Sequence, residues 1–292
     1  MTPLSSHHPP IQALNPSRKT HVMAILNMTP DSFSDGGQNA SAPLLSTITA
    51  FLEAGATMID IGGQSTAPGA PEVSLDEELA RVLPAVRLIR EQFPHRPVLV
   101  SVDTYRAAVA EAAVAAGADI VNDVSGGAMD AAMLPAVARL GATVCLMHMR
   151  GTPATMAGLA DYPDSEGGLI AGIARELVGR VRAAEEAGVR RWRIVLDPGL
   201  GFAKVGWQNV DVLRHLDELR GWPGLQGLPW LVGSSRKSFI GRVTGVPTPR
   251  ERIWGTAATV AAAVQGGADV VRVHDVKEMA QVVTMADAIW RY

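Results

Sequence analysis

Residues 98–125 read VLVSVDTYRAAVAEAAVAAGADIVNDVS, and this stretch holds one complete repeat of a strand-and-helix pattern. A short apolar run, 98–103, precedes an Ala-rich segment, 105–116, with apolar residues at helical spacing, and a second apolar run covers 119–125. Gly117 stands where the C-terminal cap of such a helix is expected. The pattern predicts a strand, a helix and a second strand.

The same alternation runs along the chain from His21 onward. The expected strands are 21–27, 58–63, 98–103, 119–125, 143–149, 193–199, 229–235 and 269–275. Helical segments such as 75–92 separate them. Strands that read as nearly continuous apolar runs are typical of a parallel sheet covered on both faces. We therefore expect an α/β protein, a (β/α)8 TIM barrel, with a doubly wound open sheet as the alternative.

Length and composition limit the domain organisation and the partners. At 292 residues the chain fits one barrel domain over 21–292, preceded by a flexible tail or linker over 1–20, which lacks apolar periodicity. A net charge of −3 without a basic block predicts no nucleic-acid partner. No apolar run reaches the roughly 18 residues of a membrane span, so we expect a soluble, cytoplasmic protein without a membrane partner. The single cysteine, Cys145, lies in an apolar run and fits a reducing compartment.

A barrel also predicts where polar residues gather, because active sites of this fold lie at the C-terminal ends of the strands. Polar side chains do occur late in the expected strands: Asn27, Asp103, Asn122, Asp123, His148, Asp197, His274 and Asp275. Surface residues scattered without function would not choose one end of so many strands. We expect the functional site at this end of the barrel.

Three of these residues point to a ligand with hydrogen-bond donors. Asp103, Asn122 and Asp197 would suit a heterocycle that presents an edge of N–H groups, since a carboxylate left unpaired in an apolar barrel costs several kcal/mol. Asp103 could instead cap a helix that begins near Thr104. His148, between two methionines in an apolar strand, is better explained as a hydrogen-bonded structural histidine.

The later loops offer cations. Residues 233–241 read GSSRKSFIG, which places two adjacent cations beside a glycine and three hydroxyls. Arg272 and His274 are two residues apart and therefore share one face of a strand. Loops seven and eight of barrels frequently bind phosphate, so this pair predicts a site for a phosphate or pyrophosphate oxygen. The loops at 27–37 and 62–69 are rich in hydroxyls and glycines, which is also common in ordinary solvated loops.

Taken together, eight strings resemble the successive loop signatures of the dihydropteroate synthase family. They are NMTPDSFSDGG, DIGGQSTAPG, SVDT, VNDVSGG, CLMHMRGTPATM, LDPGLGFAK, GSSRKSFIG and RVHDVKE. The resemblance implies a barrel that joins 6-hydroxymethyl-7,8-dihydropterin pyrophosphate to p-aminobenzoate and releases pyrophosphate with the help of Mg²⁺. It also implies a homodimer and inhibition by sulfonamides. The chain is somewhat similar to the fungal form, in which this domain ends a longer folate-synthesis protein, with a mitochondrial location as the alternative.

The resemblance assigns residues to four sites. Pterin-binding residues would be Asp103, Asn122, Val124, Met147, Asp197, Phe202, Gly233 and Lys237, of which Asp103, Asp197 and Lys237 are the expected catalytic groups. Pyrophosphate would meet Asn27, Thr66, Arg272 and His274, and Asn27 would also contact Mg²⁺. The p-aminobenzoate would lie among Phe33, Thr66, Pro68 and Ser235.

One position departs from the family. Loop two usually reads STRPG, whereas Ala67 replaces the arginine here. The loss of one charged hydrogen bond weakens transition-state stabilisation by about 1.5–3 kcal/mol. Because Arg272, His274, Asn27 with Mg²⁺ and the Thr66 hydroxyl remain, we expect activity to be retained, with altered affinity for p-aminobenzoate or sulfonamides. Two alternatives stay open: a methyltransferase that uses a reduced pterin on the same barrel, which would not need the anion site, and a non-catalytic pterin-binding relative.

Overall fold

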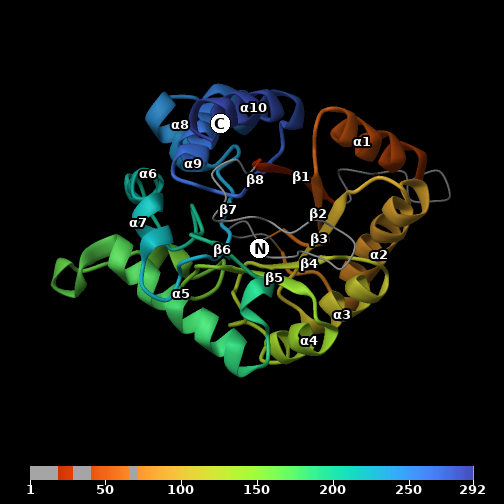
Figure 1. Cartoon of the computed structure of the whole chain (residues 1–292), viewed down its shortest axis with the longest axis horizontal. Coiled ribbons are helices and arrows are strands. Elements are labelled where there is room, and N and C mark those ends of the chain that lie inside the picture. Colours follow the sequence, from red (N-terminus) through yellow and green to blue (C-terminus); the bar gives the residue numbers. More distant parts are fainter. Residues whose placement is uncertain (1–18, 29–40, 66–70, 292) are drawn as a thin grey trace.

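The computed structural model describes residues 19–28, 41–65 and 71–291, and Figure 1 shows helices arranged around a central set of strands. The strands are β1 (His21–Asn27), β2 (Met58–Gly62), β3 (Leu99–Asp103), β4 (Ile120–Asp123), β5 (Thr143–Met147), β6 (Ile194–Asp197), β7 (Leu231–Val232) and β8 (Val270–Val273). The helices are α1 (Ser41–Glu53), α2 (Leu75–Gln92), α3 (Ala107–Ala115), α4 (Met133–Leu140), α5 (Gly168–Glu186), α6 (Gln208–Arg214), α7 (Leu216–Gly221), α8 (Ser238–Thr244), α9 (Ile253–Gln265) and α10 (Val276–Trp290). None of these helices is both long and apolar enough to cross a membrane.

The strands form one parallel sheet in the order β6-β5-β4-β3-β2-β1-β8-β7. Its two edges meet at an isolated parallel bridge between Leu196 and Trp230. There the Leu196 N–H donates to the Pro229 carbonyl over 2.9 Å. The sheet therefore closes on itself, which confirms the predicted (β/α)8 barrel and excludes the open-sheet alternative.

The barrel interior is built in layers because side chains on a strand alternate between its two faces. The lowest layer is wholly apolar and takes one residue from each strand: Met23, Met58, Leu99, Ile120, Cys145, Val195, Leu231 and Val270. Two residues further along the same strands lie Ile25, Asp60, Ser101, Asn122, Met147, Asp197, Gly233 and Arg272. The second layer is mostly polar, so the predicted site lies on an apolar floor, and Cys145 is buried as expected.

The helices cover the outer faces of the strands. In α2 the side chains of Val82, Val86 and Ile89 are buried against the barrel, and the helix spans the predicted range 75–92. Helix α3 starts two residues later than predicted and ends just before Gly117, whose φ of 116° is in the left-handed region.

Several strands are shorter than the sequence pattern predicts, and polar side chains explain two of the early ends. Asp123 Oδ1 accepts a hydrogen bond from the N–H of Ser125, and Asp197 Oδ1 accepts one from Gly199, at 2.8 and 2.7 Å. Such bonds replace the sheet pairing and turn the chain away from the barrel. In β4 and β6, the polar residue at the end of the strand therefore also causes the strand to end there.

The start of the fold is fixed at the opposite end of the barrel from the polar layer. Thr20, the last residue of the predicted tail, is buried. Its N–H and hydroxyl both donate to the Asp287 carboxylate, at 2.8 and 2.6 Å. Arg291 also donates to Thr20 and, over 3.1 Å, to the carbonyl of Val264. These contacts join the beginning of β1 to α10.

Candidate active site

An arginine joins two carboxylates inside the barrel. Arg272 of β8 donates from Nε to Asp60 Oδ2 over 2.6 Å and from Nη2 to Asp103 Oδ2 over 2.7 Å. Asn122 of β4 donates its amide N–H to the same Asp60 oxygen over 3.0 Å. Side chains from β2, β3, β4 and β8 thus form one connected network, which we call the arginine fork.

The fork leaves acceptors unused. Within the described chain, the Oδ1 atoms of Asp60 and Asp103 are buried without a hydrogen-bond partner. Buried polar atoms are nearly always paired, so these two oxygens are candidates for contact with a ligand. The helix-cap alternative for Asp103 is wrong, because the first N–H of α3, that of Ala107, donates instead to Asp130 over 2.7 Å.

Burial shifts the charge balance of Asp103. It raises the pKa of this carboxyl to about 7 against the lowering effect of Arg272, while the charges of Asp60 and Glu78 raise the pKa further. Asp103 therefore changes its charge near neutral pH. Such a shift beside unpaired acceptors is typical of functional sites.

We call residues 198–207, between β6 and α6, loop six, and residues 233–237, between β7 and α8, loop seven. Asp197, at the end of β6, and Lys237, at the end of loop seven, come together beside loop six. The Lys237 ammonium donates to the carbonyl of Leu200 and lies 4.7 Å from the centroid of the Phe202 ring. Burial lowers the pKa of Lys237 to about 8, and the charge of Asp197 opposes that shift. Lys237 sits at the N-terminal cap of α8. Lys237 is thus a buried cation beside the carboxylate of Asp197, which only partly offsets the effect of burial on the lysine pKa.

Loop seven and the end of β8 form the rim. The Ser235 hydroxyl accepts from the His274 N–H over 3.1 Å and lies 3.0 Å from His274 Nδ1. Burial, followed by the charges of Arg236 and Arg272, lowers the pKa of His274 to about 4. The imidazole is therefore neutral at physiological pH. Arg236 is in turn paired with Asp275, with Nε to Oδ2 at 3.0 Å.

Apolar side chains line the space beside these polar groups. Val124 and Met147 are buried in one cluster, and the partly buried Phe202 packs against it. At Gly233 an added Cβ would lie 3.8 Å from the Arg272 side chain, in ordinary contact, so the glycine lies directly beside Arg272. The arrangement offers flat apolar contacts next to carboxylate and amide oxygens, which suits a planar polar ring.

Most of the predicted site residues lie at this end of the barrel. Asn27 ends β1 with an exposed side chain, near the backbone of Gly62. Arg272 and His274 have different surroundings, since Arg272 belongs to the fork and His274 to the rim. Four of the residues that the sequence singled out lie outside the described residues: Phe33, Thr66, Ala67 and Pro68.

Sequence reasoning missed two residues of this region. Asp60 is fully buried in the fork, and its signal was its place two residues after Met58 on the inward face of β2. Lys204, in loop six, is buried and contacts His148, 56 positions earlier in the sequence. No sequence pattern marks a contact at that separation.

We predict that Arg272→Met will destabilise the fold by about 3–5 kcal/mol, because two buried carboxylates lose their cation. Without Arg272 the pKa of Asp103 would rise further above its unfolded value. A carboxyl group with a raised folded pKa loses stability as pH rises toward that pKa. The loss measured by urea unfolding should therefore be larger at pH 8.5 than at pH 6. Equal losses at both values would contradict the fork.

Comparison with known proteins places this site in a family. A model of pterin binding enzymes matches residues 23–274. The dihydropteroate synthase of Synechocystis is 48% identical over 275 residues, which cover 94% of this chain and 91% of that protein. The folic acid synthesis protein fol1 of Pneumocystis carinii is 49% identical over 93% of this chain, but the match spans only 36% of that longer protein.

Solved structures agree with these matches. The dihydropteroate synthase of Yersinia pestis, crystallised with a sulfonamide drug, superposes with a TM-score of 0.83 at 42% identity, over 94% of this chain and 96% of the other. The family match, the near full-length identity and the shared fold agree on one assignment. The chain belongs to the pterin-binding enzyme family and, within it, to the dihydropteroate synthases.

Proposed function

We propose that the chain condenses 6-hydroxymethyl-7,8-dihydropterin pyrophosphate with p-aminobenzoate to give 7,8-dihydropteroate and pyrophosphate, a step of folate biosynthesis. The observation that carries the proposal is the set of inward acceptors on Asp103, Asn122 and Asp197 beside Lys237, in a chain that matches a dihydropteroate synthase over 94% of its length. The methyltransferase and the non-catalytic alternatives lack comparable support.

The pterin ring would bind by complementary hydrogen bonds. Its amino group and ring N–H groups are donors, and the carboxylates of Asp103 and Asp197 are acceptors. The amide of Asn122 offers both kinds of group. Lys237 would donate to the carbonyl and N5 side of the ring, while Val124, Met147 and Phe202 contact its faces and Gly233 lines the pocket. Asp103, Asp197 and Lys237 are the groups that touch the reacting system.

The chemistry needs electrostatic stabilisation and positioning. The bond between the pterin methylene and the pyrophosphate oxygen breaks, and pyrophosphate leaves with the electron pair. The methylene cation is conjugated with the electron-rich ring, whose polar edge the carboxylates face. The aromatic amine, unprotonated at neutral pH, forms the new C–N bond and then loses a proton to solvent. Because such an amine needs orientation more than activation, we assign no general base.

Pyrophosphate would leave over the rim. His274 is neutral and can donate one hydrogen bond, and Arg272 Nη1 has no hydrogen-bond partner among the described residues. Thr66 stays a prediction. For Mg²⁺, no group of three or more His, Cys, Asp or Glu residues in the described part of the chain could hold the ion.

The donors that are present still fit a magnesium ion bound with its substrate. Mg²⁺ prefers oxygen ligands and usually keeps waters and substrate phosphates around one or two protein groups. The exposed amide oxygen of Asn27, at the end of β1, can supply such a group. When bound, the ion would neutralise charge on the departing pyrophosphate.

The p-aminobenzoate would lie beside Ser235 at the rim. Ser235 is buried beside His274, while Phe33, Thr66 and Pro68 stay predictions. Sulfonamides would compete at this position, in line with the drug present in the Yersinia pestis structure. The effect of Ala67 on sulfonamide affinity also stays a prediction, as does the cytoplasmic location with its mitochondrial alternative.

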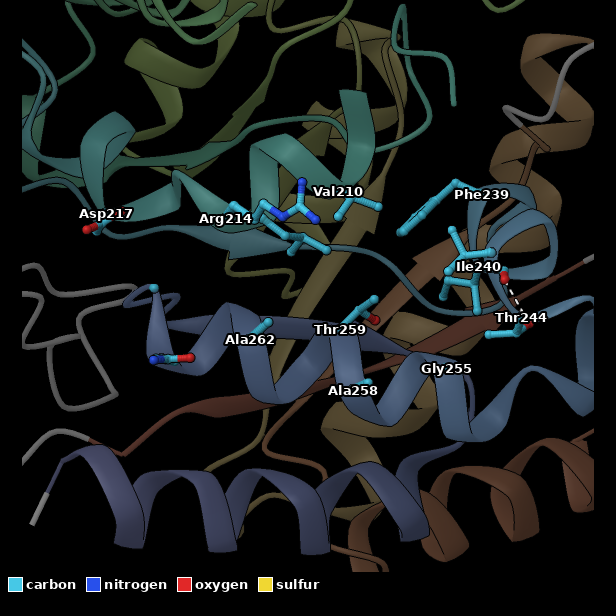
Figure 2. A pocket seen from close by; sticks show the side chains of 14 residues that line it. Val210, Arg214, Asp217, Phe239, Ile240, Thr244, Gly255, Ala258, Thr259 and Ala262 are labelled. Carbon is cyan, nitrogen blue, oxygen red and sulfur yellow. Dashed lines mark hydrogen bonds between the residues drawn. The ribbon is translucent and has the colours of Figure 1, made fainter. Parts of the chain in front are cut away.

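A homodimer would cover an apolar surface on the last helices. A cavity of about 630 Å³ lies between α6, α8 and α9, and Figure 2 shows Phe239 and Ile240 next to each other on one side of it, with Val210 on another element. Trp254 at the start of α9 is 83% exposed, and Val243 of α8 is exposed too. A contiguous apolar surface left in water marks an interaction surface. We propose that a second copy of the chain covers this surface.

We predict that Trp254→Glu will shift the protein from dimer toward monomer in sedimentation velocity at micromolar concentration. The physical reason is that burying an unpaired carboxylate at an interface costs several kcal/mol. Trp192→Glu, on a distant exposed tryptophan, serves as the matched control and should leave the dimer intact. A wild-type protein that is monomeric at these concentrations would refute the dimer.

We predict that Lys237→Ala will reduce kcat/KM by about 10- to 150-fold, because it removes a charged hydrogen bond worth about 1.5–3 kcal/mol. A coupled pyrophosphate assay, run with and without p-aminobenzoate, measures this loss. Lys277→Ala, on the exposed face of α10, should keep wild-type activity. Wild-type protein that releases no pyrophosphate, or releases it without consuming p-aminobenzoate, would disprove the proposed reaction.

The two shifted groups predict a narrow pH optimum. The kcat/KM for pterin pyrophosphate should rise through pH about 7, as Asp103 becomes an anionic acceptor, and fall through pH about 8, as Lys237 loses its charge. In Asp103→Asn the rising limb near pH 7 should disappear while the falling limb stays. If the rising limb persists in that variant, Asp103 is not its source.

A further inference from the structure

A second lysine, Lys204, belongs to loop six and has no role among the predicted site residues. The side chain of Lys204 is only 4% exposed. Its ammonium nitrogen lies 3.0 Å from the carbonyl oxygen of Gly199, 2.9 Å from that of Phe202 and 2.8 Å from His148 Nδ1. Three partners surround one buried nitrogen.

The partners of this lysine favour its charged form. A lysine ammonium has three N–H donors and no acceptor, and here it meets two carbonyl oxygens and one ring nitrogen. A neutral His148 then carries its proton on Nε2, which donates to Glu176 Oε2 over 3.0 Å. A neutral amine could donate to both carbonyls and accept from His148 Nδ1–H, but a neutral imidazole would then turn an unprotonated Nε2 toward the Glu176 carboxylate.

The shifts in the network agree with a neutral imidazole between two charges. Burial, followed by the charge of Lys204, lowers the pKa of His148 to about 3. Hydrogen bonds from His148 and Arg150 lower the pKa of Glu176 to about 2, against the raising effect of burial. Burial also lowers the pKa of Lys204, and the complete set of acceptors favours the ammonium against that effect.

The turn that Lys204 holds is the turn that faces Lys237. The two carbonyls bound by Lys204 flank Leu200, whose own carbonyl accepts from Lys237. Phe202 also presents its ring to Lys237. The turn has little freedom at its start, since a Cβ on Gly199 would lie 2.0 Å from the His148 carbonyl oxygen. Lys204 and Lys237 therefore bind carbonyls of one turn: Lys204 binds those of Gly199 and Phe202, and Lys237 binds that of Leu200.

We propose that Lys204 is a positioning residue: with His148 as its third acceptor, it fixes the turn over residues 199–202 and so sets the Leu200 carbonyl and the Phe202 ring for pterin binding. This inference rests on the proposed function, because it takes the loop-six side of the barrel as the pterin pocket. Without Lys204 the Phe202 carbonyl would lose its donor, and the Gly199 carbonyl would keep only the N–H of Phe202, at 3.0 Å. The cost of the unpaired carbonyl favours rearrangement of the turn.

The first test removes the ammonium. Lys204→Met keeps a similar length without donors, and titration calorimetry with 6-hydroxymethylpterin should give a Kd about 10- to 100-fold higher than that of the wild type. The measurement is made well below each variant's melting temperature, so that folded proteins are compared. An unchanged Kd in folded Lys204→Met would overturn the proposal.

A pair of His148 variants separates positioning from general stability. In His148→Asn the amide oxygen can stand in for Nδ1, which keeps the acceptor for Lys204 and loses the link to Glu176. In His148→Gln the amide can stand in for Nε2–H, which keeps that link and loses the acceptor. We expect a pterin Kd within about threefold of wild type for Asn and a rise of about tenfold or more for Gln.

The pair also carries the test if Lys204→Met fails to fold. The reverse order of the two His148 variants, or equal effects of both, would overturn the proposal. Turnover is measured separately on the wild type. Intact pterin binding without formation of dihydropteroate would disprove the proposed reaction alone, whereas unchanged pterin affinity in the variants of an active enzyme would disprove the role of Lys204 alone.

Discussion

The arginine fork is the contact on which the site depends. Two aspartates enter the barrel above an apolar layer, and Asp60 is fully buried there. Carboxylates in such surroundings need a cation or a proton, and Arg272 supplies the cation to both through two different nitrogens. The same bonds aim one oxygen of each carboxylate at the arginine and leave the other without a partner. A structural ion pair thereby creates the acceptors that a ligand can use.

Loops six and seven complete this pocket from the other side. Burial acts in opposite directions on the two sides, because it raises the pKa of Asp103 and lowers that of Lys237. Both groups therefore lie closer to neutrality than they would in water. The turn over residues 199–202 connects the sides, since Asp197 accepts from Gly199 at its start and Lys237 binds the carbonyl of Leu200.

Sequence alone predicted the barrel and much of the site, since both follow from short-range patterns. The period of strands and helices predicted the closed sheet, and residues late in each strand, such as Asp103 and Asn122, indicated the functional end. His148 was predicted to be structural, and it is fully buried between Lys204 and Glu176. What the sequence could not predict are contacts across the barrel, such as the fork between Arg272 and Asp60, which are 212 positions apart.

A crystal structure with 6-hydroxymethylpterin bound would show directly whether the arginine fork and Lys237 bind the pterin. We predict a ring in the barrel mouth between Met147 and the fork, with its N–H edge on Asp103, Asn122 and Asp197 and its carbonyl side on Lys237. Arg272 should still contact Asp60. A pterin bound outside the barrel, or in the barrel with its N–H edge away from these carboxylates, would contradict the account.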